Sequence, residues 1–419
     1  MSAIQRLAGG ASAASRDSNL YTAPWLETFS FSFAHPSPMA AATASSSASA
    51  SASAEVDGPR PSKLSKPSPE DGDLPVELQL PSPVRDDVPH IAPDDDEFDD
   101  SDSAVGSDGD ENSLQSLTSS ITSYVYRNGR RYASFREGRY CLPNDEAESD
   151  RHDFLQHIYG MLFGGRLIFA PISDNPEAIL DVGTGTGIWA MDVADAYPAT
   201  QVIGTDISPI QPTWVSPNIS FEIDDAESEW TFRQKFDLIH FQNLNGAIRD
   251  WRRLLSQVYD NLIPGGYIEA KETDVTAMCD DNSIPEDCFL RQWESSCIKA
   301  CALIGQTLTA PENVKQWVEE AGFVDVRERQ FRLPINTWPK DAELKLAGRY
   351  QQLQYADAIQ PYALGLLVEV LGWPRDETEV FLAGLRKDLS NRAHHGYNIV
   401  RVITGRKPGT KKRKFSDDE

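Results

Sequence analysis

Residues 178–189 read Ala-Ile-Leu-Asp-Val-Gly-Thr-Gly-Thr-Gly-Ile-Trp, and this stretch decides the fold. Its first five residues form a mostly apolar run, which predicts a strand inside a parallel sheet. Gly183, Gly185 and Gly187 predict a tight turn whose backbone amides face a ligand, because a residue without a Cβ allows close approach. Apolar residues then recur at near-helical spacing from Ile188 to Tyr197. The stretch therefore predicts a strand, a glycine loop and a helix whose N-terminus favours negative charge.

The next apolar strand, at residues 201–206, ends in Asp206, which is placed to accept hydrogen bonds from two ribose hydroxyls. A dinucleotide site requires glycine at the first, third and sixth loop positions, and Ile188 occupies the sixth position here. Asp181 would also repel a pyrophosphate, whereas its carboxylate can pair with the ammonium group of a methionine moiety. The loop therefore predicts an S-adenosylmethionine (SAM) site. A nicotinamide or flavin dinucleotide site and a glycine turn without a ligand are the alternatives.

Strands and helices alternate after the loop. We expect a strand at residues 219–223, a strand at 236–241, a helix at 247–262, a turn at 264–266 and a strand at 267–271. The pattern then predicts helices at 285–306 and 312–321, a strand at 324–331, helices at 342–371 and 377–392, and a strand at 397–404. This order indicates an α/β, Rossmann-like fold with a seven-stranded, mainly parallel sheet, flanking helices and a helical insertion before the last strand.

The helical insertion is where we expect substrate specificity to reside. Its aromatic residues are Tyr350, Tyr355, Tyr362 and Trp373. Aromatic residues on a helix pack in a core more often than they bind a ligand. We therefore do not predict that these four bind substrate.

Several segments outside the loop carry a family resemblance. They are Ser123–Tyr132, Tyr140–Glu146, Leu167–Ile172, Ile207–Pro212 and Phe221–Ala226. Together with the glycine loop they resemble class I SAM-dependent methyltransferases, and within these the fungal LaeA-like family, which is linked to secondary metabolism. The resemblance extends from residue 123 to residue 408 and implies the class I methyltransferase fold, SAM as cofactor and methyl transfer. His152 stands where leucine is common in this family, a difference that we expect to leave the cofactor site untouched.

The expected cofactor site follows from the residue pattern and agrees with the resemblance. Asp181 and the glycine loop face the methionine end of SAM, Asp206 faces the ribose, and Asp225 accepts from the adenine amino group beside the small Ala226. The expected cofactor-binding residues are Asp181, Gly183, Thr184, Gly185, Thr186, Gly187, Asp206, Ile207, Asp224, Asp225 and Ala226.

The sequence defines the catalytic residues less closely. Methyl transfer is an in-line displacement from an electrophilic sulfonium, so positioning and desolvation can supply much of the acceleration. His240 ends a predicted strand and is a candidate base for an acceptor that must lose a proton, with a structural histidine as the alternative. Tyr132 or Tyr140 is a candidate for closing the pocket around the sulfonium, because both precede the first strand of the predicted sheet.

Composition divides the chain into three parts. Residues 1–120 are low in complexity and hold 20 acidic and 6 basic side chains, so they carry 14 of the 25 net negative charges. We expect this part to be a disordered acidic region. Residues 121–407 are expected to form the methyltransferase domain, and residues 408–419 a basic and then acidic tail. The basic residues at 407–414 indicate either a nuclear import signal or solvated terminal charge.

The sequence predicts neither a metal site nor a membrane span. The five cysteines are Cys141, Cys279, Cys288, Cys297 and Cys301. Their spacing lacks the paired pattern of metal ligands. No apolar run reaches the ~18 residues that a membrane span requires, and the N-terminus lacks the pattern of a secretory signal. We therefore expect a soluble protein of the nucleus, the cytoplasm or both, without membrane binding.

The absence of two sequence motifs narrows the chemical class of the methyl acceptor. The strand at 236–241 continues into Gln-Asn-Leu, without the Pro-Pro-aromatic signature with which nucleic-acid amino-methyltransferases hold a flipped base. No clear pair of glutamates could clamp a guanidinium. We expect a small-molecule or protein acceptor, no direct nucleic-acid binding, and a SAM-dependent methyltransferase linked to secondary metabolism. The alternative is a catalytically weak SAM-fold protein that regulates through transcriptional protein partners.

Overall fold

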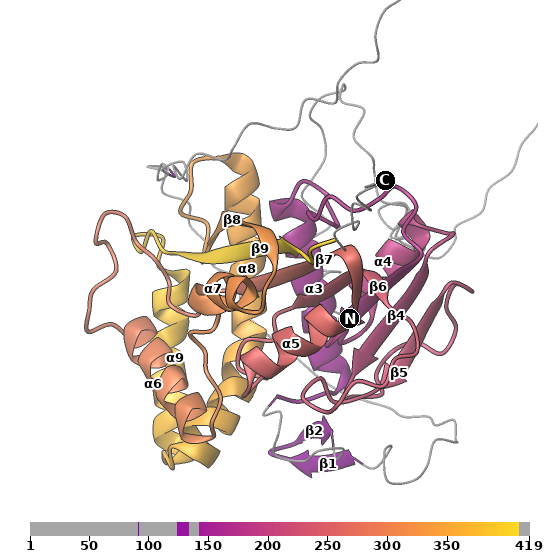
Figure 1. Cartoon of the computed structure of the whole chain (residues 1–419). Coiled ribbons are helices and arrows are strands. Elements are labelled where there is room, and N and C mark those ends of the chain that lie inside the picture. Colours follow the sequence, from indigo (N-terminus) through magenta and orange to yellow (C-terminus); the bar gives the residue numbers. More distant parts are fainter. Residues whose placement is uncertain (1–90, 92–123, 134–141, 410–419) are drawn as a thin grey trace, which may run out of the picture. The chain divides into compact units, whose positions relative to one another are not determined.

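The predicted strand lies inside a seven-stranded sheet, and the glycine loop follows its carboxyl end, in a computed structural model of the chain, which describes residues 91, 124–133 and 142–409 (Figure 1). The strands are β3 (Ala178–Val182), β4 (Gln201–Asp206), β5 (Ile219–Ile223), β6 (Phe236–Gln242), β7 (Leu262–Thr273), β8 (Val324–Pro334) and β9 (Tyr397–Arg406). Their order across the sheet is β5-β4-β3-β6-β7-β9-β8. Strand β9 runs antiparallel to both of its neighbours, whereas β3 to β7 are parallel. The predicted Rossmann-like fold is confirmed.

Helices pack on both faces of this sheet. They are α3 (Glu146–Leu162), α4 (Ile188–Ala196), α5 (Trp251–Asn261), α6 (Phe289–Leu303), α7 (Pro311–Glu320), α8 (Ala342–Tyr362), the π-helical segment η1 (Ala363–Val370) and α9 (Arg375–Ser390). Successive residues of β3 show the alternation that a strand imposes. Ile179 packs in a cluster with Val193 of α4, whereas Leu180 packs in another with Leu254 of α5 and Val314 of α7. Both side chains are fully buried, which explains the continuous apolar run in the sequence.

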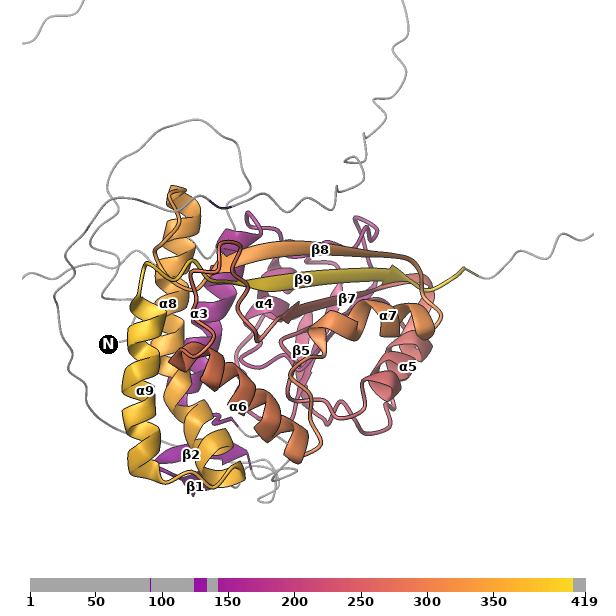
Figure 2. The same cartoon turned by 90° about the vertical axis from the view of Figure 1, so that its left-hand side faces the viewer.

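The predicted helical insertion before the last strand is also confirmed. Helix α8, segment η1 and helix α9 follow β8 and pack with α6, and Figure 2 shows α6, α8 and α9 side by side. Their core contains Cys297 of α6, Ile359 of α8, Leu366 of η1 and Leu385 of α9. Cys297 and Cys301 are buried in this core, as apolar packing on this helix favours.

Two predicted boundaries are wrong: the start of α5 and the start of β7. Helix α5 begins at Trp251 rather than at residue 247, because the Asp250 side chain accepts from the Arg253 amide at 3.0 Å and caps the helix there. Strand β7 begins at Leu262, so the predicted turn at 264–266 lies inside the strand. Gly265 has a φ of 91°, and the pairing with β6 shifts register nearby, so these glycines form an irregularity in the strand.

A hairpin and a helix before the sheet were not predicted. Strands β1 (Tyr124–Arg127) and β2 (Arg130–Ala133) form an antiparallel pair joined by Asn128 and Gly129. Both turn residues have positive φ, at 53° and 75°, which is the geometry that an Asn-Gly hairpin turn requires. The Asn-Gly pair was therefore the available signal for this hairpin.

Several predictions fall outside the described residues. These are the acidic region at 1–120 apart from Ile91, the tail beyond residue 409, Tyr140 and Cys141. Within the described part of the chain, no helix combines the length and apolar character needed to cross a membrane. The same part contains no cluster of three or more metal-ligating side chains.

Close packing of α8 against the segment after β8 gives the first prediction. A Cβ at Gly348 would overlap the backbone carbonyl of Asn336, so Gly348→Ala forces the helix and this segment apart. We expect Gly348→Ala to lower the free energy of unfolding by about 2 kcal/mol. Leu346→Ala is the matched control, because Leu346 lies on the same helix with 43% of its surface exposed. Thermal unfolding measures both variants, and equal unfolding temperatures would contradict the prediction.

Candidate active site

A cavity of about 360 Å³ opens at the carboxyl ends of β3, β4, β5 and β6. This volume lies in the range of small-molecule sites. One part, which we name the loop half, is lined by residues 183–186, 188, 206–208 and 224–227. The other part, the helical half, is lined by the ends of β6 and β7 and by α6, α8 and η1. The two halves border one continuous space.

The structure brings the predicted cofactor residues together in this cavity. Those in its wall are Asp181, Gly183, Thr184, Gly185, Thr186, Asp206, Ile207, Asp224, Asp225 and Ala226. The remaining one, Gly187, directly precedes the first residue of α4. These residues come from the ends of three adjacent parallel strands, where ligands bind in open α/β sheets.

The glycine loop has a shape that side chains would prevent. Gly183, Gly185 and Gly187 have φ values of 69°, 58° and 83°, which L residues with a side chain rarely adopt. A Cβ at Gly187 would overlap the ring of Phe221, and one at Gly183 would overlap Leu244. The loop therefore packs closely on its neighbours while its backbone borders the cavity.

Asp206 joins the glycine loop to the turn after β4. Its carboxylate accepts from the Gly185 amide at 2.9 Å and from the Ser208 amide at 2.8 Å. Burial raises the pKa of Asp206, although these two amides act in the opposite direction. Gln211 closes the turn by donating to the carbonyls of Gly185 and Ser208 at 2.5 and 2.9 Å. A carboxylate has about four acceptor sites, so Asp206 can accept further bonds from a ligand in the cavity.

The turn after β5 forms the far wall of the loop half. Asp224 accepts from the amide of Asp225 at 2.8 Å, and Asp225 accepts from the amide of Glu227 at 3.0 Å. The Ala226 carbonyl accepts from the indole of Trp230 at 3.0 Å. These local bonds fix the position of both carboxylates and of the small side chain between them and Glu227.

Asp181 and His240 are buried side chains that also line the cavity. The Thr184 hydroxyl donates to one Asp181 oxygen at 2.6 Å, and His240 Nδ1 lies 2.7 Å from the other. Burial raises the pKa of Asp181 to about 7, whereas burial and then Lys271 hold the pKa of His240 well below its ordinary value. The imidazole is fully buried and stacks on Trp189 with ring centroids 3.5 Å apart. This geometry favours the structural histidine over the catalytic base.

The two tyrosines predicted to close the pocket have different outcomes. Tyr132 is buried in the hairpin beside Arg127, whose guanidinium lies 5.1 Å from the ring centroid, and Tyr132 is not among the described residues of the cavity wall. A direct contact between Tyr132 and a ligand in the cavity is therefore not supported. Tyr140 lies outside the described residues.

Tyr159 of α3 lines the cavity instead, and no motif in the sequence indicated this role. Its hydroxyl donates to Asn243 Oδ1 at 2.8 Å and lies 2.7 Å from Thr273 Oγ1, which ties α3 to the ends of β6 and β7. Burial raises the pKa of Tyr159 to about 12, so the hydroxyl stays protonated at neutral pH.

His152 corrects a second expectation. It lines the cavity, and its Nδ1 lies 3.6 Å from where a Cβ on Gly185 would be. The imidazole Nε2 is 3.3 Å from Glu148 Oε1. The replacement of a common leucine by His152 therefore changes the polarity of the cavity wall, contrary to the expectation that it leaves the site untouched.

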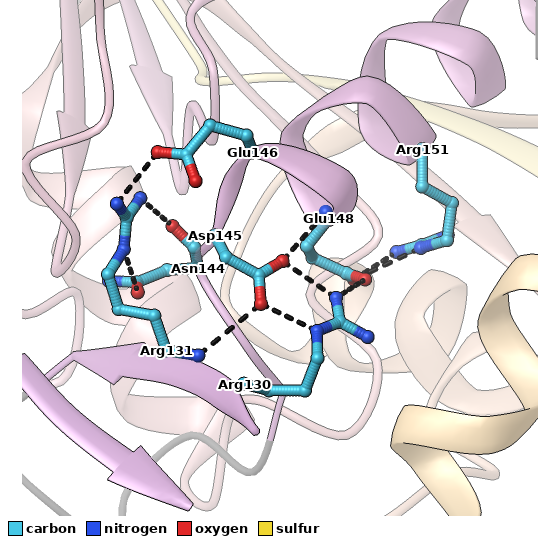
Figure 3. Close-up of polar contacts among 7 residues, drawn as sticks. All are labelled: Arg130, Arg131, Asn144, Asp145, Glu146, Glu148 and Arg151. Atoms are coloured by element: carbon cyan, nitrogen blue, oxygen red, sulfur yellow. Dashed lines mark hydrogen bonds and ion pairs between the residues drawn. The ribbon is translucent and has the colours of Figure 1, made fainter. Parts of the chain in front are cut away.

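An ion-pair network holds the first turn of α3 against this wall (Figure 3). Arg130 of the hairpin donates to both oxygens of Asp145, at 2.5 and 2.7 Å, and Asp145 caps α3 by accepting from the Glu148 amide at 3.1 Å. Arg131 donates to the Asn144 carbonyl at 2.6 Å. Because Asn144 lines the cavity, the hairpin fixes part of the wall from behind.

Glu148 extends this network into the interior. It is buried and accepts two bonds from Arg151, at 3.0 and 2.6 Å. Burial alone would raise the pKa of Glu148, but the Arg151 guanidinium and the His152 imidazole lower it to about 2. Glu148 is therefore charged at neutral pH, and its charge is part of the stability of the wall.

The insertion contributes aromatic residues to the helical half. Tyr355 and Tyr362 line it, together with Trp293 of α6. Tyr350 packs instead on Phe154 with ring centroids 5.4 Å apart, and Trp373 lies in the helical core 5.3 Å from Phe381. All four aromatic residues pack against buried clusters, as expected, and Tyr355 and Tyr362 also border the cavity.

The Glu148 network predicts a pH-dependent stability. A carboxylate whose folded pKa lies below its ordinary value of 4.5 stabilises the protein above that pH, and this contribution disappears as the pH falls toward about 2. We expect Glu148→Gln to cost about 3 kcal/mol at pH ~7, because it removes the charge opposite the buried Arg151. Denaturant unfolding at a series of pH values measures the difference from the wild type.

That difference is expected to shrink as the pH falls below 4.5, the ordinary pKa of a glutamate. Glu312→Gln, an exposed position in the first turn of α7, serves as the control. A difference that stays constant down to the acid limit of folding would refute the role of the charge.

Comparison with known proteins places the chain among methyltransferases. A methyltransferase-domain family matches residues 154–328. Methyltransferase pytC of Aspergillus terreus is 39% identical over 300 residues, which are 71% of this chain and 92% of that protein. Secondary metabolism regulator LAE1 of Cochliobolus heterostrophus is 36% identical over 288 residues, 67% of this chain and 94% of that protein. Protein-methionine methyltransferase laeA of Emericella nidulans is 32% identical over 300 residues, 70% of this chain and 79% of that protein.

These similarities cover almost the full length of two relatives, and the matched family includes the glycine loop and the strands that flank it. They confirm the resemblance noted in the sequence, the enzyme class and the cofactor. The chain therefore belongs to the LaeA-like family of class I SAM-dependent methyltransferases.

Proposed function

We propose that this chain transfers the methyl group of SAM to a small molecule of secondary metabolism. The observation that carries the proposal is the continuity of the cavity, in which the loop half and the helical half share one space. A cofactor and an acceptor held in the two halves would meet in the in-line arrangement that a displacement requires. The name of one relative, methyltransferase pytC, supports methyl transfer, and the name of another, secondary metabolism regulator LAE1, supports the metabolic context.

The residues of the loop half fit SAM in size and chemistry. Asp206 would accept from the ribose hydroxyls, and Asp225 would accept from the adenine amino group. The glycine loop would let the methionine end lie close to the backbone and to the N-terminus of α4, which favours a carboxylate. When bound, SAM supplies an electrophilic methyl group on a sulfonium.

The chain itself would act chiefly by positioning. Asp181 is held beneath the loop by Thr184 and His240, so the loop keeps its shape. Tyr159 stays protonated and donates to Asn243, which fixes the loop that follows β6. Glu272 accepts from two amides of that same loop, at 2.9 and 3.0 Å. Fixed groups of this kind orient the two reactants and exclude water between them.

The Asp206 carboxylate gives a test of the cofactor site. We expect Asp206→Asn to weaken SAM binding at least about tenfold, because a hydrogen bond to a charged group contributes about 1.5–3 kcal/mol. Isothermal titration with SAM measures the loss. Asp174→Asn is the control, since Asp174 is exposed and remote from the cavity wall. If both variants bind SAM with equal affinity, Asp206 is not a cofactor-binding residue.

The acceptor class is tested with methyl-labelled SAM and a cell extract. After incubation, the labelled products are separated into small molecules, protein and nucleic acid. Label in the small-molecule fraction that disappears with Asp206→Asn is the expected result. Label confined to protein would overturn the small-molecule acceptor while leaving the methyltransferase activity intact.

A regulatory role through protein partners is the second candidate. It is favoured by the relatives that are named secondary metabolism regulators, such as LAE1 at 36% identity. The two candidates separate on catalysis. If Asp206→Ala abolishes SAM binding and preserves the biological output, the regulatory role is supported and the enzymatic role in that output is lost.

We also infer residence in the nucleus and the cytoplasm. The support is the basic run at 407–414, most of which lies outside the described residues. A fluorescently tagged full-length chain reports the distribution. Exclusion from the nucleus would reject the import signal.

A further inference from the structure

The helical half of the cavity contains buried amide oxygens that no described group satisfies. Gln242 Oε1 at the end of β6, and Gln351 Oε1 and Gln354 Oε1 on α8, accept no hydrogen bond from the described residues. All three residues line the cavity, and Gln351 and Gln354 are only 4% and 5% exposed. Leaving a buried acceptor unpaired costs about 1–3 kcal/mol, so three of them in one cavity indicate a ligand that donates to them.

Two of these amides also bond to neighbouring side chains, which restrains their orientation. Gln242 Nε2 donates to Gln156 Oε1 at 3.1 Å. Gln351 forms a side-chain hydrogen bond with the Tyr355 hydroxyl. Tyr355 in turn donates to Asn398 Oδ1 at 2.6 Å. Neighbouring side chains therefore bond to two of the three amides, while the Oε1 atoms of all three have no partner among the described residues.

Charged groups at the helical half are already neutralised. Asp274 accepts two bonds from Arg401, both at 2.8 Å. Glu294 accepts from the Ala277 amide at 2.7 Å and from Arg291 at 2.8 Å. A charged substrate would therefore lose its hydration here without gaining a free counter-charge.

The rest of this wall is apolar or aromatic. It includes Trp293, Cys297, Ile359, Tyr362 and Leu366 from α6, α8 and η1. Such a wall favours a ligand with an apolar body, while the amide oxygens select for groups that can donate.

We propose that the helical half binds an uncharged molecule with an apolar ring body and two or more hydroxyl or N–H donors. Gln242, Gln351 and Gln354 would accept hydrogen bonds from these donors. This inference rests on the proposed function. A site built to pair with substrate donors discriminates strongly against analogues that lack them, because its buried oxygens are then left unpaired. The three glutamines thus set substrate choice.

A stability measurement tests whether the oxygens are unpaired in the free protein. Replacing Gln354 with leucine removes a buried polar group and keeps a similar volume, so the unfolding temperature of Gln354→Leu is expected to stay the same or rise. Gln360→Leu is the matched control, because Gln360 lies on the same helix and is exposed. A fall of more than about 5 °C for Gln354→Leu alone would show that the fold itself uses this amide, and would overturn the proposal.

Binding of three related probes tests the ligand class. Resorcinol carries two donors, its dimethyl ether carries none, and isophthalate carries two charges on the same ring. With S-adenosylhomocysteine present to fill the loop half, we expect resorcinol to bind the full-length chain at least about tenfold more tightly than either analogue. The preference is expected to disappear in Gln351→Leu/Gln354→Leu and to persist in Gln360→Leu.

Titration with S-adenosylhomocysteine alone separates this inference from the proposed function. If S-adenosylhomocysteine does not bind the wild-type chain, the cofactor site and the proposed function are both refuted. Intact binding without a preference for resorcinol, or a preference that survives in Gln351→Leu/Gln354→Leu, would overturn the role of the glutamines alone.

Discussion

A buried carboxylate beneath the glycine loop is the constraint on which the site depends. Asp181 lies in β3. One of its carboxylate oxygens accepts from the Thr184 hydroxyl of the loop at 2.6 Å, and the other lies 2.7 Å from His240 Nδ1 of β6. Burial raises the pKa of Asp181 to about 7, so hydrogen bonds to neutral partners, rather than a strong ion pair, hold it in place. Because the partners come from the loop and from the adjacent strand, the loop has its shape before a ligand arrives.

A second set of buried contacts connects the site to residues 167–170, which precede β3. Trp189 stacks on His240 and donates to the Leu167 carbonyl at 3.1 Å. Lys271 of β7 donates to the same carbonyl at 2.6 Å and lies 3.2 Å from Glu269. Glu269 in turn accepts from two consecutive amides, those of residues 169 and 170, at 2.6 Å each. A family-specific segment is thus anchored by an ion pair that could not stay buried without these bonds.

The sequence predicted the residues of the loop half almost completely, because the role of each depends on its local position at the end of a strand or in the turn that follows. Gly183, Gly185 and Gly187 set a backbone shape that only glycine allows, and Asp206 follows from the end of the next strand. Parallel topology then brings those strand ends to one edge of the sheet. Boundaries failed where a single side chain decided them, as at Asp250, whose cap starts α5 later than the apolar periodicity indicates.

The helical half could not be predicted, because it is assembled from segments that are far apart in the sequence. Gln242 and Gln354 lie on β6 and α8, and each is an ordinary polar residue in its local sequence. Their shared burial arises only when the insertion closes over the carboxyl edge of the sheet. The sequence motif therefore identifies the cofactor, whereas substrate recognition depends on packing that no local pattern encodes.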